Sequence, residues 1–86
     1  MKIGSAEWYS KHEGEPFPEK LRLLRWTFGA TQKEAAKMIG VSPSALIKYE
    51  GSSLSPSIGV AIKMAKAYVV SLDWLFAKEM EEAKNG

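Results

Sequence analysis

The sequence contains no cysteine, so disulfides and cysteine-ligated metal sites are excluded, and the core must be held by packing alone. Its one histidine, His12, has no second ligand at a suitable spacing, so we expect no metal ion. No apolar run approaches the about 18 residues of a membrane span, and no signal peptide is evident, which favours a cytoplasmic protein without a membrane partner. The sequence lacks a glycine-rich phosphate loop, paired carboxylates and a nucleophile–histidine set, so we expect no enzyme, cofactor or small-molecule ligand.

The chain has 86 residues, of which 45% are hydrophobic, enough for one small helical domain. The formal net charge of +2 is too small to indicate a nucleic acid by itself, but the charge is unevenly distributed. Residues 18–50 carry a net +3, from Lys20, Arg22, Arg25, Lys33, Lys37 and Lys48 against Glu19, Glu34 and Glu50. The residues from Asp73 onward carry −2. This bias favours a DNA-facing surface on residues 18–50, with an ordinary solvated surface as the alternative.

Residues 31–50 predict two short helices joined by a tight turn. Thr31 followed by Glu34 is the pattern of a capping box, which begins the first helix. Gly40 follows the last apolar residue of that helix, where a left-handed backbone suits glycine. Ser42 and Pro43 are the residue types preferred at the cap and at the first position of the second helix. A helix, a glycine turn and a second helix together make a helix-turn-helix.

This stretch resembles the Cro/repressor (XRE-like) family of helix-turn-helix DNA-binding proteins, and the resemblance extends over residues 18–76. Residues 19–25 resemble the family's first helix, which ends in an arginine. Tyr49-Glu50 matches the end of its recognition helix, Pro56 falls where its fourth helix opens, and residues 71–75 match its entry to helix five. The resemblance implies an all-α, compact, five-helix lambda-repressor-like domain with an N-terminal extension, residues 1–17, and a C-terminal helix extension and tail, residues 77–86. We expect the last two helices at about residues 57–68 and 72–83.

The second helix of the motif is predicted to have an inner face with Leu46 and Tyr49. Its outer face, which aligns with the family's base-reading positions, consists of Pro43, Ser44, Ile47 and Lys48. Gln32, at the start of the first helix, and the nearby lysines suit phosphate contacts. The complete set of expected DNA-binding residues is Thr31, Gln32, Lys33, Lys37, Ser42, Pro43, Ser44, Ile47, Lys48 and Ser53.

Two further features follow from the resemblance. It implies an ion pair between Arg25 and Glu50 that ties the first helix to the recognition helix. The sequence departs from the family after Glu50, where the loop 51–55 has no basic residue, so phosphate contacts there depend on hydroxyls and main-chain N–H groups. It also departs at Val69-Val70, where the family has glycine; because valine resists positive φ, we expect a differently built turn.

The N-terminal extension is predicted to contain a short helix capped by Ser5. Trp8 and Tyr9 in this helix are large apolar groups, which should pack either on the domain or on a second subunit. Because an operator of ordinary length needs two recognition helices, we expect a homodimer on double-stranded DNA. The expected dimer interface consists of Trp74, Phe76 and Met80, followed by Trp8 and Tyr9.

These features predict a sequence-specific DNA-binding transcriptional regulator, with repression as the preferred role, that inserts the helix 43–50 into the major groove. The alternative is a helix-turn-helix fold used mainly for protein–protein contacts, as an antitoxin-like protein or adaptor with weak DNA binding. The apolar side chains of Pro43, Ile47 and Leu54 keep this alternative open.

Overall fold

The computed structural model describes residues 5–85, and every regular element in this range is a helix. The seven helices are α1 (Ala6–His12), α2 (Phe17–Thr27), α3 (Gln32–Ile39), α4 (Pro43–Glu50), α5 (Ile58–Tyr68), α6 (Leu72–Leu75) and α7 (Ala77–Asn85). The all-α prediction is confirmed. The predicted five helices become seven because the N-terminal extension supplies α1 and the predicted last helix is divided into α6 and α7. Residues 1–4 of the predicted extension and Gly86 of the predicted tail lie outside the described residues.

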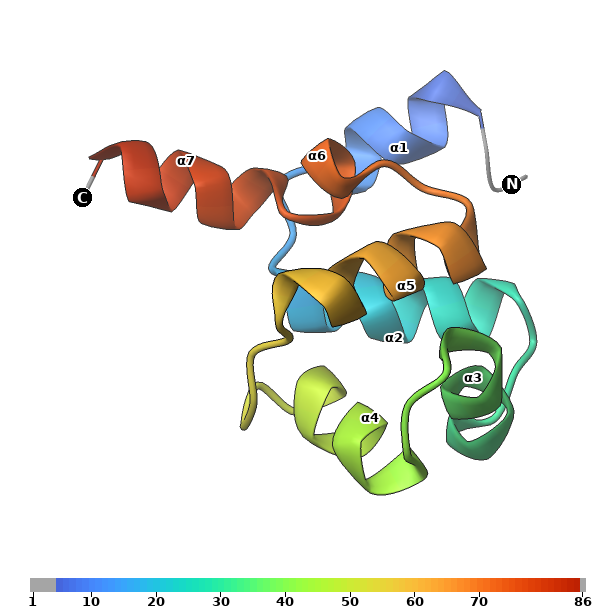
Figure 1. Ribbon diagram of the computed structural model, residues 1–86. Helices are drawn as coiled ribbons and strands as arrows, with labels where there is room; N and C mark the ends of the chain where they lie inside the picture. Colours follow the sequence, from blue (N-terminus) through green and yellow to red (C-terminus); the bar gives the residue numbers. More distant parts are fainter. Residues whose placement is uncertain (1–4, 86) are drawn as a thin grey trace.

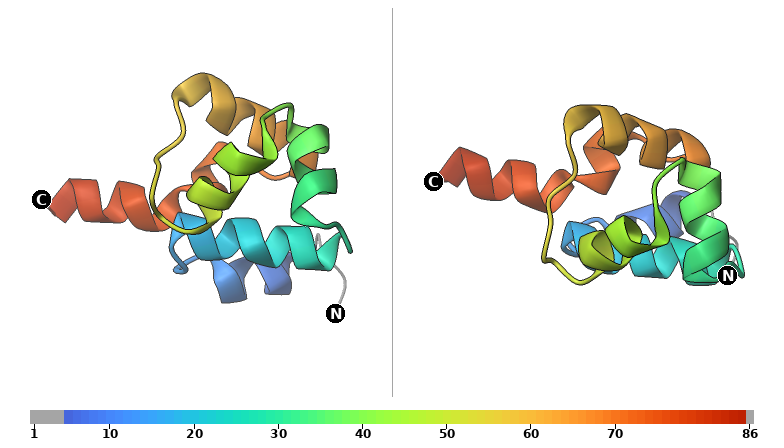
Figure 2. Two further views of the ribbon diagram at one scale, coloured as in Figure 1. Left: turned by 90° about the horizontal axis from the view of Figure 1, so that it is seen from below. Right: turned by 60° about the horizontal axis from the view of Figure 1, so that its bottom comes forward.

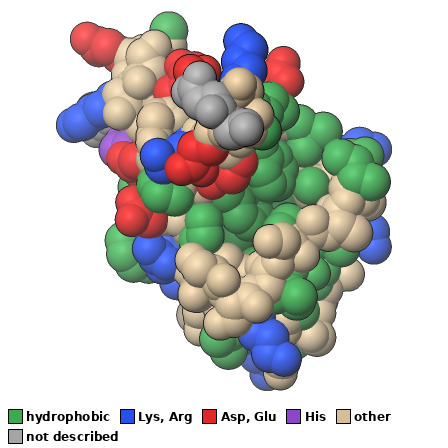
Figure 3. All heavy atoms as spheres, turned by 90° about the vertical axis from the view of Figure 1, so that its left-hand side faces the viewer, with side chains coloured by type: hydrophobic (Ala, Val, Ile, Leu, Met, Phe, Trp, Pro, Cys, Tyr) green, Lys and Arg blue, Asp and Glu red, His purple; other side chains and the backbone are tan. Residues whose placement is uncertain are grey.

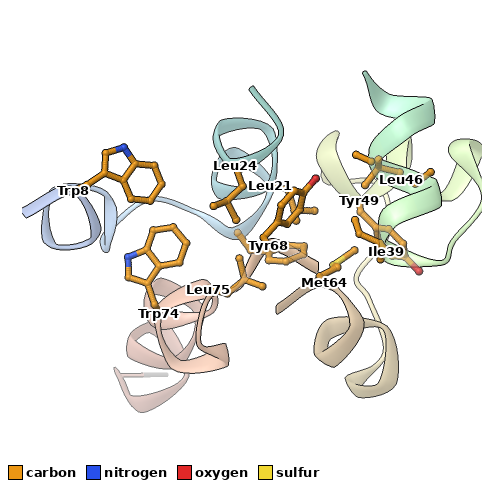
Figure 4. Close-up of a cluster of buried hydrophobic side chains, with 13 residues drawn as sticks. Trp8, Leu21, Leu24, Ile39, Leu46, Tyr49, Met64, Tyr68, Trp74 and Leu75 are labelled. Carbon is orange, nitrogen blue, oxygen red and sulfur yellow. The ribbon is translucent and has the colours of Figure 1, made fainter. Parts of the chain in front are cut away.

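Helices α3 and α4 lie at one end of the domain, α1 and α6 lie at the other, and α2 and α5 lie between them (Figure 1). Helix α7 projects from this body in every view (Figures 1 and 2). The apolar faces of the helices meet in one core, which runs from Trp8 to Ile39 (Figure 4). Its completely buried members include Leu21, Leu24, Leu46, Met64 and Leu75. Because α3 and α4 contribute to this core, the motif is held against the rest of the domain.

Hydroxyl side chains begin most of the helices. The side-chain oxygen of Ser5, Thr31, Ser42, Ser57 or Ser71 accepts the main-chain N–H three residues further on in α1, α3, α4, α5 and α6. At α3 the predicted capping box is complete. Thr31 Oγ1 accepts the N–H of Glu34 at 3.1 Å, and Glu34 Oε1 accepts the N–H of Thr31 at 2.8 Å. The hydrogen bonds to Thr31 lower the pKa of the Glu34 carboxyl.

Helix α1 packs against α6 through aromatic side chains. The Trp8 and Trp74 rings stack with their centroids 5.7 Å apart, and Tyr9 meets Trp74 edge-on at 5.3 Å. The Trp74 indole N–H also donates to the main-chain oxygen of Tyr9 at 2.7 Å. Only 4% of Trp8 and 9% of Trp74 is exposed. This burial speaks against a place for the two tryptophans in a dimer interface, because their rings pack on each other within one chain. Of the two locations expected for Trp8 and Tyr9, the structure shows packing on the domain.

The predicted continuous helix over residues 72–83 is interrupted at Phe76, whose backbone (φ −111°, ψ 19°) ends α6. The Phe76 ring stacks on Phe17 with the centroids 4.6 Å apart. One turn later, Glu79 Oε2 accepts the N–H of Phe17 at 2.8 Å, which places a carboxylate at the start of α2. These contacts join the C-terminal segment to α2. The apolar spacing within residues 72–80 fits one helix and gave no sign of the break, because the contacts at the break are with a distant segment.

Helix α5 ends at Tyr68, and the next residue, Val69, has a left-handed backbone with φ 55° and ψ 49°. This conformation crowds the Cβ of any L-residue and is most unfavourable for β-branched side chains. The expectation of a differently built turn at Val69-Val70 is therefore wrong. The chain makes the left-handed turn that glycine would favour, although residue 69 is valine. Since 78% of Val69 is exposed, the side chain gains little by burial there.

Candidate nucleic-acid interface

Helices α3 and α4 form the predicted motif, and the turn 40–42 joins them. Gly40 has a left-handed backbone, with φ 93°, and its N–H closes the last turn of α3. Ser42 Oγ accepts the N–H of Ala45 at 3.1 Å, so α4 starts where the sequence predicts it. The hydroxyl oxygens of Thr31 and Ser42 are thus acceptors within the chain, which leaves their O–H hydrogens for an external acceptor.

Helix α4 has the two faces that the sequence predicts. Leu46 and Tyr49 are buried in the core. The exposed side chains on the other face are Pro43, Ser44, Ile47 and Lys48. Half of Ile47, 51%, is exposed, although isoleucine is a residue that proteins usually bury. The first part of α4 therefore presents a mixed polar and apolar face at the end of the domain.

The positive charge around the motif is smaller than the sequence suggests. The three exposed cations on α3 and α4 are Lys33, Lys37 and Lys48. Lys20 is completely buried and donates to two main-chain oxygens, so its charge does not reach this surface. Arg22 and Arg25 both bind Glu50. The net charge counted over residues 18–50 therefore overstates the cations available to a phosphate, because burial and pairing were not visible in the sequence.

Glu50, the last residue of α4, is the centre of a polar network. Arg25 Nε donates to Glu50 Oε2 at 2.8 Å and Arg25 Nη2 donates to Oε1 at 3.1 Å, which makes a bidentate pair. Arg22 adds a hydrogen bond to the main-chain oxygen of Glu50. Only 3% of Glu50 is exposed. The structure thus brings together the two residues for which the resemblance implied an ion pair.

Gln32 also binds this carboxylate. Its Nε2 donates to Glu50 Oε1 at 3.1 Å, and the side chain is half-buried at the first position of α3. The sequence predicts a phosphate contact for Gln32. It gives no indication of the bond to Glu50, because the two residues are 18 positions apart. The reason is that the first residue of α3 and the last residue of α4 meet only when the two helices are packed.

The loop after α4 carries Ser53, the last of the predicted DNA-binding residues. The N–H of Ser53 donates to the main-chain oxygen of Lys48 at 2.9 Å, and its side chain is exposed. Its neighbour Ser52 has a left-handed backbone with φ 67°. No basic residue lies between Gly51 and Ser57, so this loop can offer a phosphate only hydroxyl groups and main-chain N–H groups.

Outside the motif, the single histidine and the acidic side chains are the candidates for another kind of site. His12 Nδ1 lies 2.6 Å from Glu15 Oε2, so the single histidine of the chain is paired with a neighbouring glutamate. Between residues 5 and 85, no three potential metal-ligating side chains of the His, Cys, Asp or Glu type gather. Helices in the same range are all too short or too polar to cross a membrane.

Two short helices joined by a glycine turn, with the first residues of the second helix exposed, define a helix-turn-helix DNA-binding module. A model of the helix-turn-helix family matches residues 21–75. The chain therefore belongs to the helix-turn-helix family of DNA-binding transcriptional regulators, and its resemblance to Cro/repressor proteins is confirmed. The prediction that it is not an enzyme is confirmed by this membership.

Individual relatives agree with the family. An HTH-type transcriptional regulator of Methanocaldococcus jannaschii is 35% identical over 63 residues, which cover 73% of this chain and 96% of that protein. The HTH-type transcriptional regulator ImmR of Bacillus subtilis is 33% identical over 67 residues; these cover 78% of this chain but 53% of ImmR, so the chain spans about half of that relative. The crystal structure of the P22 c2 repressor with a synthetic operator matches with a TM-score of 0.68 and 30% identity, over 71% of this chain and 92% of the other.

Proposed function

We propose that the protein is a sequence-specific repressor that acts in the cytoplasm, and that α4 enters the major groove of its operator. The observation that carries this proposal is the exposed face at the start of α4. The opposite face of the helix is packed into the core through Leu46 and Tyr49. The major groove, about 12 Å wide, admits one α-helix. The similarity to the P22 c2 repressor, solved with a synthetic operator, supports this mode of binding.

The outer face of α4 gives each side chain a chemical role. Lys48 can donate to O6 and N7 of guanine, and Ser44 can bond to either a purine or a pyrimidine edge. Pro43 and Ile47 offer only apolar contact, for example to the methyl group of thymine. Since no arginine, asparagine or glutamine on this face can read a base bidentately, direct discrimination is modest and DNA shape supplies part of the specificity.

Phosphate contacts hold the protein in register. Lys33 and Lys37 are exposed on α3 and supply the charge, while Thr31, Ser42 and Ser53 supply hydroxyl groups at the ends of the motif. Because the loop after α4 has no cation, few counterions are released on binding. We therefore expect a shallow dependence of affinity on salt and weak non-specific binding at physiological salt.

The test begins with selection of bound duplexes from a random pool, followed by affinity measurements on the selected sequence. Lys48→Ala should weaken binding by roughly 1–3 kcal/mol and relax the preference at one base pair. Lys37→Ala should weaken all duplexes about equally and lower the log–log salt slope by about one unit. Lys11→Ala is the matched control, because Lys11 is an exposed lysine on α1, at the end of the domain away from α4. If the pool yields no bound duplex even at low salt, the proposal fails.

The proposed active form is a homodimer on double-stranded DNA, since two half-sites lie about 34 Å apart. With both tryptophans buried and Tyr9 packed on Trp74, Phe76 and Met80 remain from the expected interface. They line an apolar hollow together with Pro56, Ile58 and Leu72. Figure 3 views this side and shows hydrophobic side chains gathered beside α7. Ile58, at the start of α5, is 73% exposed, and Met80 is 47% exposed. Apolar side chains exposed to this extent support a surface that is covered in the assembly.

Sedimentation of the parent and of Ile58→Glu tests the dimer. We expect the parent to sediment as a dimer at high micromolar concentration or on DNA, and the variant to sediment as a monomer with weaker operator binding. Trp26→Gln is the control, because Trp26 is 64% exposed on α2 but does not line the hollow. A parent that stays monomeric both free and on its operator, or a variant that still dimerises, contradicts this interface.

A protein-binding role is the second candidate, because Ile47 and Leu54 are 51% and 45% exposed near the motif. It differs from DNA binding in its salt dependence, since apolar contacts gain little from low ionic strength. Should the duplex selection fail, the surface around Pro43, Ile47 and Leu54 is the one on which to seek a protein partner.

A further inference from the structure

We infer that two copies of the chain exchange their C-terminal helices: α7 of each copy packs in an apolar hollow beside α5 of the other. This exchange rests on the homodimer of the proposed function and names the surfaces that meet in it. The hollow is not the one that Ile58 and Met80 line, although Leu72 belongs to both. Its lining consists of Ile62, Ala65, Lys66, Val69, Val70 and Leu72.

Helix α7 is the first of two surfaces that lack a partner in the single chain. Its own chain holds it near its start, where Glu79 accepts the N–H of Phe17. From Met80 to Lys84 every side chain is exposed. Isolated helices shorter than about 12–15 residues are marginal in water, because most helices of proteins are stabilised by the packing of one face. With 9 residues, α7 therefore needs a surface on which to pack.

The hollow beside α5 is the second such surface. Ile62 and Val69 in its lining are 40% and 78% exposed. Val69 also has the left-handed backbone, with φ 55°, that is unfavourable for valine. A strained backbone that carries an exposed apolar side chain points to a contact outside the single chain. The strain is present in each chain, whereas the methyl groups of Val69 gain their contact only in the dimer.

The occupant of the hollow comes from a second copy, because α7 cannot reach it within one chain. Only Phe76 separates α6 from α7, and the Phe76 ring is stacked on Phe17. Figures 1 and 2 show α7 leading away from the turn that follows α5. In a twofold dimer every contact is made twice. Each copy therefore gives its α7 to the partner and receives the α7 of the partner.

The charges of the two surfaces are complementary. Helix α5 carries two lysines and no acidic residue, whereas α7 carries three glutamates and two lysines. Lys66 in the hollow is exposed and forms no ion pair within residues 5–85. The same holds for Glu81, the neighbour of Met80 on α7. In the exchange, Met80 enters the hollow of the partner and Glu81 lies beside Lys66 at its rim.

The first test is cross-linking between copies, because the cysteine-free chain allows one thiol to be placed at a time. Val69→Cys is mixed with Ala83→Cys, an exposed position one turn beyond Met80, and treated with a short bismaleimide, with and without the selected duplex. Mass spectrometry identifies the linked pair. We expect the mixed pair to form at least about 10-fold faster than either pair of identical variants, because docking raises the local thiol concentration. Lys11→Cys with Ala83→Cys is the control, since Lys11 is exposed on α1.

The second test is charge reversal, read as the dissociation constant of the dimer in sedimentation. Lys66→Glu and Glu81→Lys should each weaken the dimer roughly 3- to 10-fold, because each places two like charges side by side twice in one dimer. The double variant Lys66→Glu/Glu81→Lys restores both pairs and should return to within about 2-fold of the parent. Lys63→Glu is the matched control, because Lys63 lies on α5 but does not line the hollow.

The exchange is overturned if the parent dimerises while the mixed pair reacts no faster than the Lys11 control. It is also overturned if the double variant is as weak as the single ones. In both cases the homodimer of the proposed function stands and uses another surface. Fast cross-linking and rescue in a protein that selects no duplex support the exchange and reject the DNA-binding proposal. A parent that stays monomeric both free and on DNA rejects the exchange together with the homodimer.

Discussion

The ammonium nitrogen of Lys20 lies 2.6 Å from the main-chain oxygen of Trp74, and no part of Lys20 is exposed. The same nitrogen donates to the main-chain oxygen of Glu13 at 2.6 Å and lies 4.8 Å from the centre of the Trp74 ring. One lysine of α2 therefore connects the end of α1 with α6. Burial lowers the pKa of Lys20 below 10.5, and the nearby carboxylates, Glu79 first, oppose that shift.

Lys20→Met tests this connection. The variant keeps the apolar stem but leaves two main-chain oxygens without their donor, so we expect a loss of about 1 kcal/mol of unfolding free energy at pH 7. Because the pKa is lower in the folded state than in the unfolded chain, the parent gains stability as pH rises through the folded pKa towards 10.5. The difference between parent and variant should therefore widen with pH. Urea unfolding at pH 7 and pH 10 measures it, with the exposed Lys11→Met as control; equal stabilities at both pH values contradict this role.

Tyr68→Phe should change the alkaline behaviour of the domain. Tyr68 is 1% exposed, and burial raises the pKa of its hydroxyl to about 12, with the charge of Glu50 adding to the shift and Arg25 opposing it. Between the unfolded pKa near 10 and the folded value, the unfolded chain loses this proton first, so parent stability falls as pH rises. Over that window Tyr68 accounts for a loss of roughly 3 kcal/mol, since each pKa unit corresponds to about 1.4 kcal/mol. Denaturation of both proteins between pH 9 and pH 12 should show a shallower fall for the variant, and parallel curves contradict the prediction.

Val69→Gly should stabilise the protein by about 0.5–1 kcal/mol. Glycine adopts the left-handed backbone of residue 69 without the crowding of Cβ, which outweighs the larger entropy that glycine loses on folding. Val69→Ala is the matched control, because it removes the exposed methyl groups but keeps Cβ and hence the strain. Thermal melting compares the three proteins, and an equal shift for alanine and glycine contradicts a backbone origin.

Arg25→Ala should cost more stability than the removal of both charges. The single change leaves Glu50, 3% exposed, without its bidentate partner, and breaking a buried pair in this way costs about 3–5 kcal/mol. Arg25→Met/Glu50→Met removes both charges and fills the space with apolar atoms, so we expect a loss well below that of the single change. Urea unfolding of the two variants decides the order, and the reverse order contradicts it.

The parts of the fold that the sequence predicts well depend on neighbours in the chain. Thr31 and Glu34 are three residues apart, and the turn at Gly40 depends on the conformational freedom of one residue, so both could be read directly. The inner face of α4 follows from the spacing of Leu46 and Tyr49. The Arg25–Glu50 pair came from the family resemblance, since its 25-residue separation carries no local signal.

The parts that the sequence misses depend on distant segments. Lys20 was counted as a surface cation because its acceptors are main-chain oxygens of residues 13 and 74, which have no side-chain signature. Trp74 was placed on a free surface because the covering helix α1 lies outside the region of family resemblance. The break at Phe76 and the Gln32–Glu50 bond likewise exist only after packing. At the candidate site, residue types were thus predictable, whereas the direction in which Gln32 points was not.

The most direct test of the central claim is an NMR titration of the labelled protein with its selected duplex. If α4 enters the groove, the amide signals that shift most should belong to residues 31–33 and 42–48, with the Lys48→Ala variant losing the discrimination between the selected and a random duplex. The signals of α1, at the other end of the domain, should stay in place. Shifts concentrated on α1, or no shifts in α4 at saturating DNA, would contradict the account.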